Sequence, residues 1–125
     1  MQFEFIQSDV DQDRPLIYMW EIHDTSKVLV GRYVGKAKGG AERPLRHYKR
    51  NVVRLLDGEP YRKGNPDGYR LIHRALADAV RRDFTISLTF LCNVMEGDDI
   101  NQVESEQIKK QNSNGQESWQ LNGTF

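Results

Sequence analysis

Two short apolar runs near the start of the chain limit the folds that it can adopt. Residues 16–22 (LIYMWEI) and 28–34 (VLVGRYV) are rich in aromatic and β-branched side chains, which favour strands. The five residues between them, 23–27, are polar and turn-like. Strands joined by so short a connection pair as an antiparallel hairpin. We therefore expect a sheet rather than an all-helical domain.

Two further strands are indicated on either side of this hairpin in the chain. Residues 2–7 (FEFIQS) have the character of a short edge strand. Residues 84–92 (FTISLTFLC) alternate apolar and polar side chains, which is typical of a strand with one buried face.

Three helices are predicted from apolar residues at helical spacing, over about 44–56, 66–82 and 99–110. Pro44 suits the first turn of the first helix, and Asn65 suits the cap of the second. The order β-β-β-α-α-β-α predicts an α+β fold with a small, mostly antiparallel three-stranded sheet flanked by helices. We expect residues 1–125 to form a single domain.

Charge is balanced over the whole chain but is distributed unevenly along it. Eighteen Lys and Arg residues match eighteen Asp and Glu residues. Residues 32–82 hold 14 Lys and Arg against five Asp and Glu, whereas both flanking parts are acidic. A basic middle section favours a surface that neutralises phosphates, although the same side chains are also compatible with two solvated helix faces.

Several classes of protein are disfavoured by what the sequence lacks. It contains no GxxxxGK[ST] phosphate loop, no GxSxG motif and no dinucleotide-binding GxGxxG pattern, so no organic cofactor is expected. The one cysteine, Cys92, lies in a strand pattern, and the three histidines lack metal-ligand spacing. No apolar run is long enough for a bilayer, and acidic residues from Asp9 onward interrupt any signal peptide. These features predict a cytoplasmic protein with no membrane partner.

Two tyrosines and two helix residues are candidates for a site. Tyr18 lies within one strand of the predicted hairpin and Tyr33 near the end of the other, so both hydroxyls could approach one end of the sheet. Arg43 and His47 are four residues apart in a predicted helix and therefore share a face. Structural roles are equally compatible, because tyrosine is common in strands and an Arg–His pair is often solvated.

A glutamate on the last predicted helix is a further candidate. Glu104 lies four residues from both Ile100 and Ile108, on the stripe that faces the core, whereas Glu106 should face water. A buried carboxylate is costly unless a metal ion or a cation satisfies it. A salt bridge to a neighbouring arginine is the alternative.

Taken together, these residues resemble the GIY-YIG nuclease family, which is named for two strand motifs that each contain a tyrosine. The motifs correspond to Leu16-Ile17-Tyr18 and Tyr33-Val34-Gly35, and the latter continues into Lys36-Ala37-Lys38. Arg43 and His47 follow at the family's spacing. Glu104 before Ile108-Lys109-Lys110, and the later pair Leu121-Asn122, match the end of the family pattern.

The chain departs from this family pattern at three points. Leu16 replaces the first glycine, the interval between the two tyrosines is longer than usual, and so is the interval from Glu104 to Asn122.

The resemblance implies a DNA endonuclease of the restriction or phage type that hydrolyses phosphodiester bonds with Mg²⁺ (or Mn²⁺). In this interpretation Glu104 is the metal ligand, and Arg43 holds the scissile phosphate. Tyr18 or Tyr33 is the general base, and nearby cations, Arg32, Lys36 and Arg43, would favour its phenolate. His47 would assist proton transfer or bind phosphate, and Asn122 would orient the glutamate or a metal-bound water.

The expected partner is double-stranded DNA, and self-association would give a small nuclease reach across both strands. Ten residues are candidate DNA contacts or simply solvated side chains: Arg32, Lys38, Arg46, Lys49, Arg50, Arg54, Arg62, Lys63, His73 and Arg74. The loosened first motif also motivates an alternative, a catalytically silent DNA-binding module on the same fold. A structural interaction domain that binds no nucleic acid is the third hypothesis.

Overall fold

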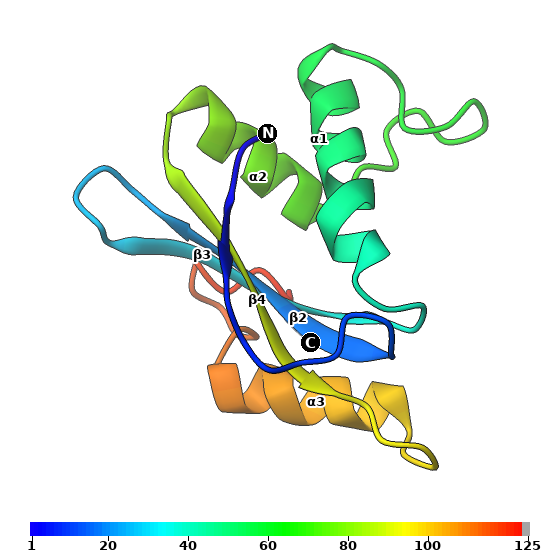
Figure 1. Cartoon of the computed structure of the whole chain (residues 1–125). Helices are drawn as coiled ribbons and strands as arrows, with labels where there is room; N and C mark the ends of the chain where they lie inside the picture. The colour runs from blue at the N-terminus through cyan, green and yellow to red at the C-terminus, as the bar shows by residue number, and fades with distance from the viewer. Residues whose placement is uncertain (124–125) are drawn as a thin grey trace.

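A computed structural model of the protein describes residues 1–123; the last two residues of the predicted domain lie outside this range. Within this range the chain forms four strands and three α-helices (Figure 1). In order, they are β1 (Glu4–Ile6), β2 (Leu16–His23), β3 (Leu29–Ala37), a π-helical turn η1 (Arg43–His47), α1 (Tyr48–Leu56), α2 (Leu71–Arg81), β4 (Thr85–Asn93) and α3 (Ile100–Gln111).

The strands form one mixed sheet in the order β1-β4-β2-β3. The predicted hairpin is confirmed, because β2 pairs antiparallel with β3, and β2 also pairs antiparallel with β4. The predicted three-stranded sheet is wrong in detail, since β1 adds a fourth strand parallel to β4. Packing explains this addition: Phe3 lies edge-on to Trp20 and Phe5 edge-on to Phe90, which anchors the N-terminal segment on the sheet.

The helices cover both faces of the sheet, with α1 and α2 on one face and α3 on the other (Figure 1). Because side chains alternate along a strand, β2 contributes to two separate cores. Tyr18 and Trp20 are buried in the core under α1 and α2. Ile17 and Met19 are buried in the core under α3. We call these the α1/α2 core and the α3 core.

The second helix begins later than the sequence predicts. The expected start near residue 66 is wrong, because residues 57–70 form a loop and α2 begins at Leu71. Contacts within the loop compete with helix formation: the Tyr69 hydroxyl donates to the Glu59 carbonyl at 2.9 Å, and the Tyr61 N–H donates to the Pro66 carbonyl at 2.9 Å. The loop therefore places Arg70 as the residue that precedes α2.

The C-terminal segment runs beside β3, the strand at the end of the sheet order. The Arg32 N–H donates to the Trp119 carbonyl at 2.8 Å, and the Leu121 N–H donates to the Arg32 carbonyl at 3.0 Å. The Asn122 side chain continues this pairing, since its Oδ1 accepts from the Val34 N–H and its Nδ2 donates to the Val34 carbonyl, both at 2.8 Å. Among residues 1–123, no helix combines the length and apolar character needed to cross a membrane.

Candidate active site

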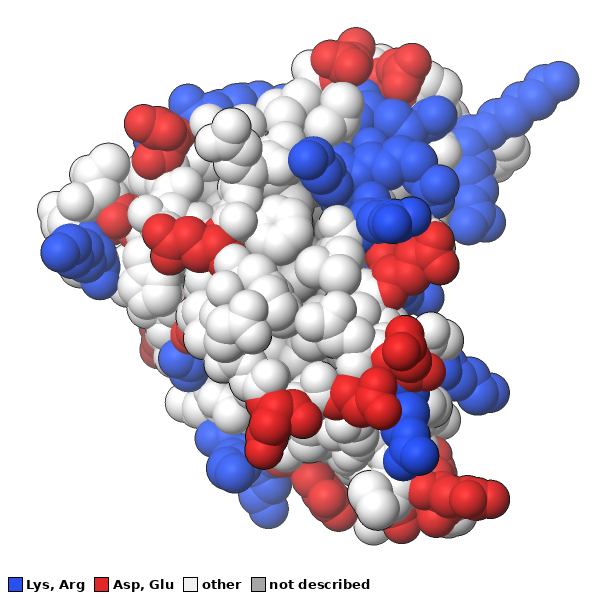
Figure 2. All heavy atoms as spheres, viewed as in Figure 1, with Lys and Arg blue, Asp and Glu red and all other residues white. Residues whose placement is uncertain are grey.

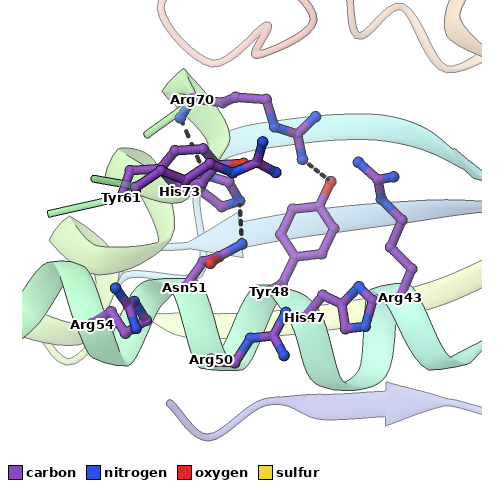
Figure 3. A pocket seen from close by; sticks show the side chains of 10 residues that line it. Arg43, His47, Tyr48, Arg50, Asn51, Arg54, Tyr61, Arg70 and His73 are labelled. Carbon is purple, nitrogen blue, oxygen red and sulfur yellow. Dashed lines mark hydrogen bonds between the residues drawn. The ribbon is translucent and has the colours of Figure 1, made fainter. Parts of the chain in front are cut away.

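Three tyrosine hydroxyls are linked through one guanidinium group at the edge of the α1/α2 core. The hydroxyls of Tyr18 and Tyr48 share a hydrogen bond of 2.5 Å. Arg70 Nη2 donates to the Tyr48 hydroxyl at 2.8 Å (Figure 3), and Arg70 Nη1 donates to the Tyr33 hydroxyl at 3.1 Å. We call Tyr18, Tyr33, Tyr48 and Arg70 the tyrosine cluster.

The strand register brings the first two tyrosines together. Tyr18 lies opposite Gly35, and Tyr33 lies opposite Trp20, so both phenol rings project from the same face of the hairpin. A Cβ atom at position 35 would overlap the ring of Tyr18. Gly35 therefore makes room for that ring, which gives the glycine of Tyr33-Val34-Gly35 a steric role.

The helix residues reach the cluster through η1 and the start of α1. Tyr48 is the first residue of α1, and its ring lies 5.6 Å from the Tyr18 ring centroid and 5.5 Å from that of Trp20. Arg43 and His47 precede it within the wider π-helical turn, and both project beside Tyr48 (Figure 3). The expectation that Arg43 and His47 share a face is confirmed.

Glu104 approaches the cluster from the opposite face of the sheet. It is half-buried on α3, whereas Glu106 is exposed, so the predicted helix faces are confirmed. Burial raises the pKa of the Glu104 carboxyl, and the charges of Lys36, Arg43 and Arg70 oppose that rise. Lys36 also donates to the Asn101 side chain on the same helix. Because Arg43 and Arg70 act on Glu104 and also on Tyr18, these groups belong to one electrostatic neighbourhood.

Burial holds the tyrosines in their neutral form. Loss of hydration raises the pKa of Tyr18 to about 12, and although Arg43 and Arg70 lower it, burial has the larger effect. Burial likewise raises the pKa of Tyr33 to about 12, with Arg70 acting against it. The cations Arg43 and Arg70 therefore favour the phenolate of Tyr18, as expected, but their effect is smaller than that of burial.

Arg32 does not join the cluster. Alternation along β3 places its side chain on the face opposite to Tyr33, where its guanidinium forms a 2.7 Å ion pair with Glu21. Its Nη1 also donates to the Gln111 carbonyl at 2.8 Å. Arg32 therefore does not supply the field that was expected at the phenols, and its expected contact with DNA stays a prediction.

Two further predicted site residues have structural roles. Both ends of the Asn122 amide are bonded to the backbone of Val34, which gives this side chain a structural role in attaching the C-terminal segment to β3. Its role in orienting Glu104 or a water stays a prediction. His73 is only 2% exposed, which corrects its expected place on the helix surface. Its Nδ1 accepts from the Arg70 N–H at 3.1 Å and so caps the start of α2.

The other predicted DNA contacts lie outside the tyrosine cluster. Lys and Arg side chains gather over α1 and the loop that follows it (Figure 2). Some of the predicted contacts have protein partners: Arg54 Nη2 donates to the Pro60 carbonyl at 2.9 Å, and Arg74 Nη2, on α2, donates to the Asp67 carbonyl at 3.2 Å. The exposed members of the predicted set are Lys38, Arg46, Lys49, Arg50, Arg62, Lys63 and Arg74.

Sequence reasoning missed two members of the cluster. Tyr48 fits the apolar stripe of its helix, so its burial is predictable, but its hydroxyl contacts depend on tertiary packing. Arg70 falls inside the helix predicted over 66–82, where it would look like an ordinary solvated side chain. No local signal marks it, because the loop contacts that set its position span ten residues.

Glu104 is the carboxylate in this neighbourhood that could bind a divalent metal ion. Within residues 1–123, no three His, Cys, Asp or Glu side chains gather closely enough to hold a metal ion by themselves. A single carboxylate such as that of Glu104 is a suitable ligand for Mg²⁺, since that ion commonly keeps several waters and takes few protein ligands.

Comparisons with protein-family models, with curated proteins and with solved structures found no match.

Proposed function

We propose that the protein is a divalent-metal-dependent DNA endonuclease that hydrolyses phosphodiester bonds. The observation that carries this proposal is the convergence of two phenols, two guanidinium groups and one carboxylate from residues 18 to 104 of the chain. Titratable groups with shifted pKa values that gather beside a pocket are typical of catalytic sites. A resemblance of short motifs to the GIY-YIG nucleases adds the reaction class.

The chain's own residues divide the work as follows. Arg43 and Arg70 would bind the scissile phosphate and offset the charge that develops on it. Glu104 would hold Mg²⁺ or Mn²⁺, which supplies positive charge for the phosphoryl group and the leaving oxygen. His47 lies exposed beside Arg43, where it would donate to a phosphate oxygen or carry a proton.

Tyr33 is the better candidate for the general base. Its side chain is half-buried, and its hydroxyl is bonded to the exposed residue Arg70, so a water can reach it. Tyr18 is only 1% exposed, and its hydroxyl is bonded to Tyr48. Tyr18 would therefore fix the position of Tyr48, and through it Arg70, rather than take a proton from water.

A second function, binding of DNA without cleavage, is favoured by one specific observation. Burial raises the pKa of both Tyr18 and Tyr33 to about 12, so neither phenol is a ready base at neutral pH. The basic residues over α1 would still bind a phosphate backbone in that case (Figure 2).

The test is cleavage of supercoiled plasmid with Mg²⁺ or Mn²⁺, and its key variant is Glu104→Gln. We expect this change to lower cleavage by about a thousandfold while DNA binding persists, because it removes the carboxylate proposed to hold the metal ion. Glu106→Gln is the matched control, since it alters an exposed carboxylate two residues away on the same helix. Wild-type protein that retains plasmid but never cuts it would favour the binding module. Normal cleavage by Glu104→Gln would remove Glu104 from the site.

A further inference from the structure

A basic pocket of about 440 Å³ adjoins the tyrosine cluster, between α1, the 57–70 loop and the start of α2 (Figure 3). Ten side chains line it, and none of them is acidic. Five of the ten are arginines: Arg43, Arg50, Arg54, Arg62 and Arg70. Arg43 and Arg70 are also the arginines that act on Glu104, so the pocket is continuous with the proposed reaction site.

The uncharged groups of the pocket also present hydrogen-bond donors. Burial, together with the charges of Arg70 and Arg43, lowers the pKa of His73 to about 4, so its ring is neutral. Because Nδ1 accepts a hydrogen bond from the Arg70 N–H, the ring hydrogen is on Nε2. Asn51 Nδ2 lies 3.5 Å from Nε2, and because that ring nitrogen carries a hydrogen, the amide satisfies it once turned so that its oxygen faces the ring. Its NH₂ group is then available to an acceptor in the pocket.

Little within the protein offsets the positive charge of this pocket. Arg50 is exposed on α1 and forms no ion pair with any of residues 1–123. The guanidinium of Arg62 lies over the Tyr61 ring at 5.1 Å. The nearest carboxylate contact is that of Arg54 with Glu59, at 3.9 Å. A concave surface with one sign of charge concentrates ligands of the opposite sign.

We propose that this pocket is a second phosphate subsite, which holds the backbone phosphodiester next to the one at the tyrosine cluster on the same nucleic-acid strand. The inference rests on the proposed function and adds to it the path of the substrate strand, which continues past the reacting phosphate between α1 and the 57–70 loop. Guanidinium forks match the oxygen geometry of phosphate, which favours an anion of this class over a carboxylate or a halide.

The experiment measures the binding of a trinucleotide with a 5′-hydroxyl, whose only phosphates are diesters, by calorimetry at low salt without divalent metal. Arg50→Ala should weaken binding about tenfold, because it removes a charge-assisted contact. Arg62→Ala, from the facing loop, should have a comparable effect. Arg81→Ala is the matched control: it removes the same charge from an exposed position of α2, which does not line the pocket, and should change binding less than about twofold.

The other possible outcomes distinguish the diester subsite from a diffuse positive field and from a site for strand ends. Equal losses for Arg50→Ala and Arg81→Ala would mean that a diffuse field binds the strand, and this would overturn the subsite. Binding only by the 5′-phosphorylated trinucleotide would replace the diester subsite with a site for strand ends. If pocket-dependent binding holds but wild-type protein never cuts plasmid, the subsite stands and the proposed endonuclease activity fails.

Discussion

The two faces of the sheet are built from alternate residues of the same strand, yet they differ in chemistry. The α1/α2 core contains Tyr18, Tyr48 and the buried His73 among its aliphatic residues. The α3 core is formed by Ile17, Met19 and other apolar side chains. The first core therefore combines packing with a hydrogen-bonded polar network, whereas the buried residues of the second are apolar.

This difference indicates how one small fold separates stability from proposed chemistry. Hydroxyl and guanidinium groups are placed where α1, α2 and the edge of β3 meet, and their mutual hydrogen bonds offset the cost of burying them. The α3 core contributes only Glu104, from the border of its helix. Substitutions of the polar groups in the α1/α2 core should therefore change turnover, whereas substitutions in the α3 core should change stability.

The largest effect is expected for Tyr33→Phe in the α1/α2 core. It removes a hydroxyl but little volume, so turnover should fall about 10²- to 10⁴-fold while the melting temperature changes little. Wild-type turnover should also rise about tenfold per pH unit between pH 7 and 10, because the pKa of Tyr33 is about 12 and the phenolate is the reactive base. Single-turnover plasmid cleavage across this pH range measures both effects. A variant that keeps full turnover, or a flat wild-type profile, would return Tyr33 to a structural role.

In the α3 core, Ile17→Ala should act on stability instead. Ile17 is 0% exposed, so truncation should lower the free energy of unfolding by about 2–5 kcal/mol. Urea denaturation measures this loss, and cleavage per folded molecule should stay near the wild-type value. A loss of turnover as large as that of Tyr33→Phe would show that the two cores are not separable.

The smallest effect concerns the pH dependence of stability in the α1/α2 core. The pKa of His73 is about 4 in the folded state, against 6.5 for an unperturbed histidine, so the unfolded chain binds the additional proton between these values. Stability should therefore fall as pH decreases from about 6.5 to 4. His73→Gln should reduce this fall in urea midpoints, whereas His47→Gln, at an exposed position, should retain it. Identical falls in all three proteins would rule out His73 as the cause.

Local patterns predicted the part of the molecule that depends on local geometry. The hairpin of residues 16–34 and the inward face of Glu104 follow from periods of two and 3.6 residues, and both are confirmed. These two features bring Tyr18, Tyr33 and Glu104 to the same end of the sheet.

What the sequence did not predict depends on contacts between distant segments. The parallel pairing of β1 arises from aromatic packing across the sheet, and the position of Arg70 arises from the fold of the 57–70 loop. The neutral state of the phenols follows from burial under α1, which charge patterns along the chain do not report. Arg32 was assigned correctly to a strand, but the assignment did not anticipate that Glu21 lies opposite it on β2.

The separation of Glu104 from the tyrosines in the chain has a consequence for biosynthesis. A ribosome makes the phenols and the basic middle section well before it makes α3. On the proposed function, a nascent chain would carry the arginines proposed to bind phosphate while it still lacks the carboxylate proposed for cleavage. Translation order alone would then delay any nuclease activity until nearly the whole fold has left the exit tunnel, without a separate inhibitor.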